Sequence, residues 1–121
     1  MGRICLSGDV LHLDGERVRL IQEGLEFYRE IKDVVRYGSI SLIDNTVEYY
    51  RAPEGRQVYL KEYEGRKLVI VHFLECAEKI SLPLEGYRLK RAFTDLAYTA
   101  EGELEIEGRP FAAGAFLLER I

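Results

Sequence analysis

The feature that most constrains the fold of this chain is a change of hydrophobic period at Gly38. Before Gly38, apolar residues recur at positions 18, 21, 25 and 28 and at 20, 27, 31 and 34. This spacing predicts one amphipathic helix of about 20 residues. After Gly38 the period is two, which is typical of strands. The chain should therefore fold as one helix followed by a β-rich part.

Residues at both ends of the helical segment are typical of helix caps. Asp14 is a predicted N-cap, because its carboxylate can accept hydrogen bonds from the first helical amides. Leu13 and Val18 have the spacing of a hydrophobic staple. Gly38 is predicted to end the helix in a left-handed conformation.

The residues after Gly38 contain eight segments with strand character. They are 39–44, 47–52, 57–63, 67–74, 79–82, 87–94, 103–107 and 111–119. Turn sequences such as Glu64-Gly65, Glu85-Gly86 and Glu101-Gly102 separate them. Short, evenly spaced strands without helices between them predict hairpins in an antiparallel sandwich or barrel.

The resulting fold class is mainly β. We expect an antiparallel β-sandwich of about eight strands, preceded by a short N-terminal strand and one long amphipathic helix. The change of period predicts two parts, a strand-loop-helix unit over residues 1–38 and a sandwich domain over residues 39–121. Segment 67–74 is apolar on both faces, so it should be a central strand.

The charge balance excludes several partner classes. Among 121 residues, 17 are Lys or Arg and 21 are Asp or Glu, which gives a net charge of −4. Proteins that bind nucleic acid or anionic lipid are usually basic, so neither is an expected partner. No apolar run approaches the roughly 20 residues of a membrane span. We therefore expect a cytoplasmic protein that does not insert into membranes.

Metal, cofactor and nucleophile motifs are weak. His72 and Cys76 are four residues apart on a predicted strand, which separates them by about 13 Å. Cys5 lies in an apolar segment that keeps a thiol inert, and nothing obvious orients His12 for catalysis. A glycine-rich phosphate loop is missing from the sequence. We expect no metal and no cofactor.

Two features are candidates for binding. Tyr59 and Tyr63 should share the outward face of one strand, opposite Val58 and Leu60, with further tyrosines in segment 47–52. Exposed tyrosines can stack against sugar rings, but tyrosine also fills half-buried sheet faces without any ligand. Asp9 follows a short apolar segment and precedes the helix, as functional residues of barrel enzymes do, although such a residue often only bonds nearby amides.

The N-terminal sequence GRICLSGDVLHLDGERVRLIQEGLEFYREI resembles the last strand and helix of the (β/α)8 barrel in melibiase-type glycoside hydrolases, the α-galactosidase families. In those enzymes a C-terminal antiparallel sandwich follows, like residues 39–121, with a closing strand similar to residues 111–118. The resemblance implies that Asp9 borders the sugar site as a binding residue. The nucleophile and acid/base, two carboxylates about 5 Å apart, come from earlier barrel strands that have no counterpart in these 121 residues.

We therefore expect a non-catalytic C-terminal portion of an α-galactosidase-like glycoside hydrolase, inactive as an isolated chain. Ile4, Leu6 and one helix face would need cover, which predicts a homo-oligomer or a barrel-containing partner chain. One alternative is an independent carbohydrate-binding module that uses Tyr59 and Tyr63. Another is a protein-interaction or assembly domain, and an activity centred on Asp9 and His12 ranks last.

Overall fold

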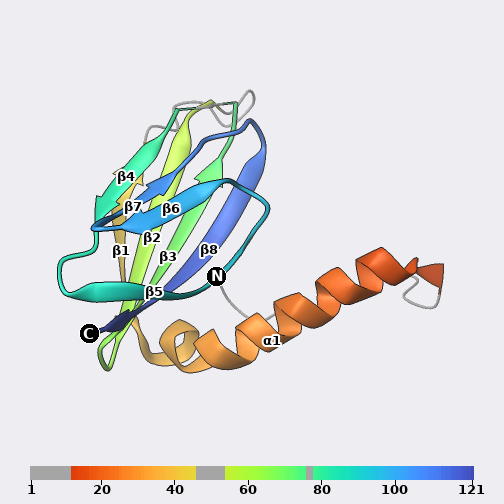
Figure 1. Cartoon of the computed structure of the whole chain (residues 1–121), viewed down its shortest axis with the longest axis horizontal. Helices are drawn as coiled ribbons and strands as arrows, with labels where there is room; N and C mark the ends of the chain where they lie inside the picture. The colour runs from red at the N-terminus through yellow and green to blue at the C-terminus, as the bar shows by residue number, and fades with distance from the viewer. Residues whose placement is uncertain (1–11, 46–53, 76–77) are drawn as a thin grey trace.

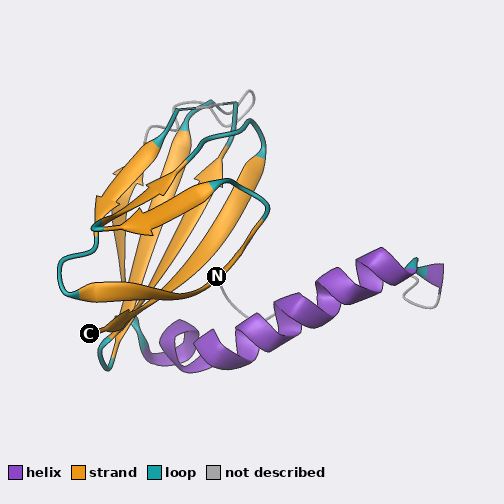
Figure 2. Cartoon of the chain, viewed as in Figure 1, coloured by secondary structure: helices purple, strands orange, loops and turns teal. Residues whose placement is uncertain are grey.

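The structure is a computed structural model that describes residues 12–45, 54–75 and 78–121. It is mainly β, with two antiparallel sheets and one helix (Figures 1 and 2), so the predicted sandwich is confirmed. The elements are α1 (Gly15–Tyr37), β1 (Ser39–Asn45), β2 (Arg56–Tyr63), β3 (Arg66–Phe73), β4 (Ile80–Pro83), β5 (Tyr87–Thr94), β6 (Tyr98–Glu101), β7 (Glu103–Ile106) and β8 (Ala112–Arg120).

The two sheets enclose the main hydrophobic core. The larger sheet has the strand order β1-β2-β3-β8-β5 and the smaller one β4-β7-β6, and Figure 1 shows the smaller sheet lying over one face of the larger. Strand β3 is the third of five, as its apolar faces predict. Inward side chains from both sheets form the core, including Val58, Val71, Phe73, Leu104, Ile106 and Phe116.

One observed strand was not predicted, and one predicted strand lies outside the described residues. The structure contains a strand that the sequence pattern did not predict, β6, which pairs with β7 across the Glu101-Gly102 turn. Its residues are exposed or half-buried, so the alternation that marks a strand is weak there. The predicted strand over residues 47–52 lies outside the described residues. Each of the other predicted segments overlaps an observed strand.

Helix α1 starts as predicted but ends differently. The Asp14 carboxylate accepts a hydrogen bond from the Arg17 amide at 2.8 Å, which confirms the N-cap. Gly38 has φ −68° and ψ 144°, so the predicted left-handed terminator is wrong. The chain passes directly into β1 in an extended conformation. Glycine is needed there for space, because a Cβ atom would lie 2.4 Å from the Val34 carbonyl oxygen.

The helix packs on the outer face of the larger sheet. Phe27, Ile31 and Val34 are buried there in a second cluster with Leu68 and Leu117. The first turns of α1 are exposed and continue past the strands (Figure 1). The division of the chain into units 1–38 and 39–121 stays a prediction.

Candidate functional site

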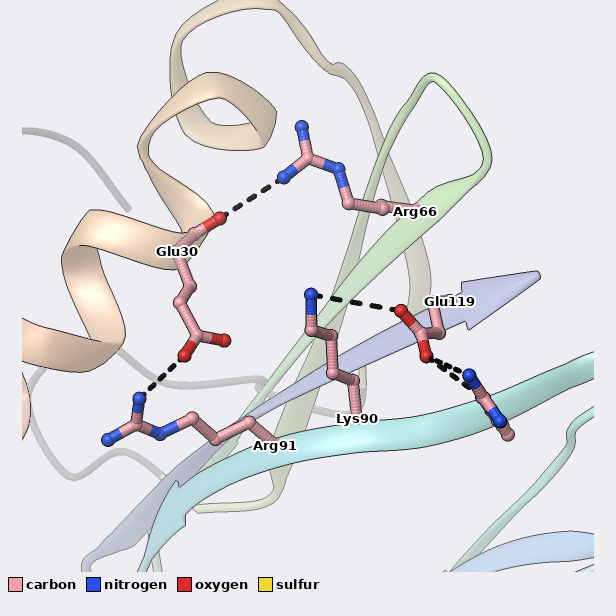
Figure 3. A network of polar contacts seen from close by, with 6 residues as sticks. Glu30, Arg66, Lys90, Arg91 and Glu119 are labelled. Carbon is pink, nitrogen blue, oxygen red and sulfur yellow. Dashed lines mark hydrogen bonds and ion pairs between the residues drawn. The ribbon is translucent and has the colours of Figure 1, made fainter. Parts of the chain in front are cut away.

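A polar network fastens α1 to the sheet (Figure 3). The Arg91 guanidinium of β5 donates to the Glu30 carboxylate at 2.7 Å and pairs with Glu26 at 3.4 Å. Arg66 of β3 donates to the Glu30 carbonyl oxygen at 3.2 Å, and Lys61 of β2 donates to the Val35 carbonyl oxygen at 2.8 Å. Side chains from three strands therefore fix the position of the helix on the sheet.

Arg91 has a more specific role than its sequence context indicates. Arg91 belongs to a basic stretch, residues 88–91, in which Arg88 and Lys90 are exposed. Arg91 instead turns to the helix, and its hydrogen bond to Glu30 is the largest reason why the pKa of Arg91 is raised. The other Glu30 carboxylate oxygen, Oε2, is buried without a hydrogen-bond partner. The Glu30 carboxylate therefore has one strong hydrogen bond, to Arg91, and the pair has a structural role in joining α1 to β5.

The outer face of the larger sheet is organised in cross-strand rows. One row pairs Lys61 with Leu68, Leu68 with Leu117 and Leu117 with Arg91, and α1 covers it. The next row along the strands runs through all five of them and is apolar. We call it the apolar row, and its members in strand order are Leu42, Tyr59, Ile70, Ala115 and Phe93. At about 4.8 Å per strand the apolar row spans roughly 19 Å.

A groove lies between the apolar row and the N-terminal half of α1. Its volume is about 750 Å³, and Leu20 and Glu23 of α1 contribute to its lining. Four residues of the apolar row also line it: Tyr59, Ile70, Ala115 and Phe93. The Phe93 ring stacks on the Phe27 ring of α1, with 5.9 Å between the ring centres. The groove therefore has an apolar floor that is already shaped by packing.

Polar side chains also line the groove. Glu23 comes from the helix, His72 from β3, and Asp95 from the turn after β5. The Arg109 guanidinium donates to Asp95 at 2.6 Å. This hydrogen bond lowers the pKa of the Asp95 carboxyl, which is therefore ionised at neutral pH. The groove thus combines an apolar floor with hydrogen-bonding groups from three separate elements.

The two tyrosines that were predicted to bind a sugar together have different surroundings in the structure. Both lie on the outward face of β2, as expected, while Val58 and Leu60 pack into the sandwich core. Tyr59 lines the groove, but Tyr63 does not. The Tyr63 ring packs against Tyr37 at 5.6 Å, and burial raises its pKa. Tyr59 is thus the tyrosine whose surroundings fit a binding role, whereas Tyr63 supports the helix end. Asp9 lies outside the described residues.

The helix carries a second apolar surface that does not face the sheet. Val18, Ile21 and Leu25, which we call the second stripe, lie about 120–180° around the helix axis from Phe27. They are not part of the cluster that packs on the sheet, and Val18 is 38% exposed. A helix that is apolar on two sides is typical of one that packs between two layers.

The described part of the chain shows neither a cluster of metal ligands nor a helix that could span a membrane. In residues 12–45, 54–75 and 78–121, no group of three or more His, Cys, Asp or Glu side chains is placed to hold a metal ion. The one helix described there is too polar to cross a membrane.

Sequence reasoning did not find the groove itself. Leu20 was assigned to an apolar helix stripe, and Glu23, Phe93 and Asp95 were not singled out. Their positions are far apart in sequence, and only the placement of α1 across the strands brings them together. A weak signal was available in the apolar residues that α1 has beyond those needed to cover one sheet face.

Comparisons with known proteins bear mainly on the fold. No protein-family model matches the chain, and no curated protein matches it. Among solved structures, the chain is similar to an α-amylase from Anoxybacillus, described as giving insight into a new glycosyl hydrolase subclass. The TM-score is 0.59 at 20% sequence identity, and the match covers 92% of this chain. The chain spans about a quarter of the amylase, since 24% of that chain is matched. This chain therefore shares its fold with part of a glycoside hydrolase.

Proposed function

We propose that this chain is a non-catalytic domain of a glycoside hydrolase that supports a separate catalytic domain. The observation that carries the proposal is the fold likeness, which covers nearly all of this chain but only 24% of the α-amylase. The remaining part of that enzyme has no counterpart here. A parent enzyme of the α-galactosidase type is the narrower form of the proposal, and it depends on the sequence around Asp9.

The second stripe on α1 gives the proposal a physical basis. The sheet covers the side of the helix that carries Phe27, Ile31 and Val34. Val18, Ile21 and Leu25 lie on another side of the helix, and none of them belongs to the cluster that packs on the sheet. Burying three such side chains against a neighbouring domain would contribute about 1.5–3 kcal/mol each at most. The helix would then be shared between the sandwich and the catalytic domain.

The proposal is tested on the protein as it occurs in its source cells. Antibodies raised against residues 12–121 are used to precipitate it from a native extract with measurable glycosidase activity. The precipitate is assayed with nitrophenyl α-glucoside, nitrophenyl α-galactoside and soluble starch. We expect glycoside hydrolysis in the precipitate and none from the purified 121-residue chain. Precipitates without any glycosidase activity, or activity in the purified chain, would refute the proposal.

The contact itself is tested with a charged substitution in the second stripe. Ile21→Asp should lower the glycosidase activity that co-precipitates with the chain, because it places a carboxylate in the proposed interface. Thr99→Asp is the control, since Thr99 is exposed on β6 of the smaller sheet, away from the second stripe. Equal activity with both variants would show that the second stripe is not the contact.

A further inference from the structure

The groove beside α1 presents two kinds of surface to a ligand at once. Its floor is a strip of apolar side chains in register, with the Tyr59 ring at one side and small residues such as Ala115 at its middle. Its polar lining comes from Glu23, His72 and Asp95, on three different elements. The ligand that fits should therefore have one apolar face and hydrogen-bonding groups at its edges.

We propose that the groove binds a neutral oligosaccharide, with the Tyr59 ring as the stacking surface and Glu23, His72 and Asp95 as hydrogen-bond partners. A sugar ring has a C–H face that can lie on an aromatic ring and hydroxyl groups around its edge that donate to carboxylates. This pairing matches the floor and the polar lining of the groove together.

The dimensions of the groove agree with such a ligand. A volume of about 750 Å³ lies in the range of small-molecule sites. The apolar row extends beyond the groove to Leu42 on the edge strand β1, where the side chain is 47% exposed. A row of roughly 19 Å is long enough for an oligomer and not only for a single sugar.

The charges of the groove argue against other occupants. The groove lining has carboxylates at Glu23 and Asp95, of which Asp95 is paired with Arg109, and none of its described lining residues is Lys or Arg. The Glu23 carboxylate therefore disfavours phosphates and other anions. An apolar ridge from a protein would remove water from both carboxylates without replacing their hydrogen bonds, which is unfavourable. A polyhydroxylated neutral ligand replaces that water with hydroxyl donors.

The proposal does not depend on the domain role proposed above. The groove lies on the sheet side of α1, where Leu20 and Glu23 project, whereas the second stripe lies elsewhere around the helix. An oligosaccharide in the groove and a catalytic domain on the second stripe can be bound at the same time. The two proposals can therefore fail separately.

The test is titration of the full 121-residue chain with maltotetraose, cellotetraose and raffinose, followed by amide NMR shifts and calorimetry. We expect at least one of the three sugars to bind and to shift amides around the groove, at residues 70–72 and 92–95. Tyr59→Ala should weaken that binding about tenfold. Tyr98→Ala is the control, because Tyr98 is 40% exposed on the other sheet.

A second pair of variants avoids any doubt about folding. Glu23→Ala changes an exposed helix residue that lines the groove and should weaken binding about tenfold. Gln22→Ala changes its exposed neighbour, which does not line the groove, and should leave binding unchanged. The proposal is overturned if none of the three sugars shifts the groove amides at a sugar concentration of about 50 mM. It is also overturned if binding survives both Tyr59→Ala and Glu23→Ala, or if the groove amides shift with protein concentration alone.

Discussion

The packing of α1 on the sheet predicts a large loss of stability for Ile31→Ala. Ile31 is fully buried against the outer face of the larger sheet, in the cluster with Leu68 and Leu117. The substitution removes the equivalent of three methylene groups, which is about 2.4 kcal/mol of transfer free energy. The cavity adds to this loss, because strand residues cannot move to fill it. Alanine offsets a few tenths of a kcal/mol, about 0.4, through its higher helix propensity.

The free energy of unfolding should therefore fall by about 3 kcal/mol. Urea unfolding followed by far-UV circular dichroism and tyrosine fluorescence measures it, and coincident curves support two-state behaviour. With an m value of about 1.5–2 kcal/mol/M, the midpoint should fall by roughly 1.5–2 M.

Leu25→Ala is the matched control for the orientation of the helix. Leu25 belongs to the second stripe and is only half-buried, so its truncation should cost about 1 kcal/mol or less in the isolated chain. An equal loss for Leu25→Ala and Ile31→Ala would mean that the sheet does not select the Phe27, Ile31 and Val34 side of the helix. A loss under about 1 kcal/mol for Ile31→Ala would refute the packing argument itself.

Three further predictions follow from particular contacts. Arg91→Gln should lower the unfolding midpoint more at low salt than at high salt, because its pairs with Glu30 and Glu26 are partly exposed; a midpoint loss that does not depend on salt would contradict the ionic role. Asp95→Asn should reduce the free energy of unfolding above the ordinary carboxyl pKa of 3.8. The difference from the wild type should vanish as the pH falls through the lowered pKa of folded Asp95, because both side chains are then neutral. Urea titrations between about pH 2 and pH 7 measure this difference, and a difference that stays constant over that range would contradict the prediction. Gly38→Ala should destabilise by about 1–3 kcal/mol, because its Cβ would lie 2.4 Å from the Val34 carbonyl oxygen, and a thermal melt unchanged from the wild type would show that the junction can relax.

Local sequence signals predicted the individual elements well. The Asp14 cap is a contact between residues three apart, so its geometry is nearly complete once the helix forms. The turn at Glu64-Gly65 has positive φ at both residues, 46° and 75°, as the type I′ turn of a two-residue hairpin requires. Strand β6 was missed because its exposed residues lack an alternating pattern. Gly38 was misread because a glycine needed for space looks the same in sequence as one needed for positive φ.

The candidate site was much less predictable. The outward direction of Tyr59 follows from the period of two, but its neighbours do not. Phe93 reaches the same row only because β8 lies between β3 and β5, a pairing between segments far apart in the chain. The sequence alone could not say whether Tyr59 or Tyr63 would line a groove, since both have the same local pattern.

The sequence by itself determined one amphipathic helix, a set of short antiparallel strands, and the inward or outward direction of most side chains, because periodicity acts over a few residues. Only the tertiary structure decided which part of the outer face α1 covers. That placement depends on contacts across more than 25 residues, such as Arg91 with Glu30 and Lys61 with Val35. Because α1 lies along one row of the sheet and covers the next row only in part, the fold leaves a groove beside the helix and a second apolar side of the helix that does not face the sheet.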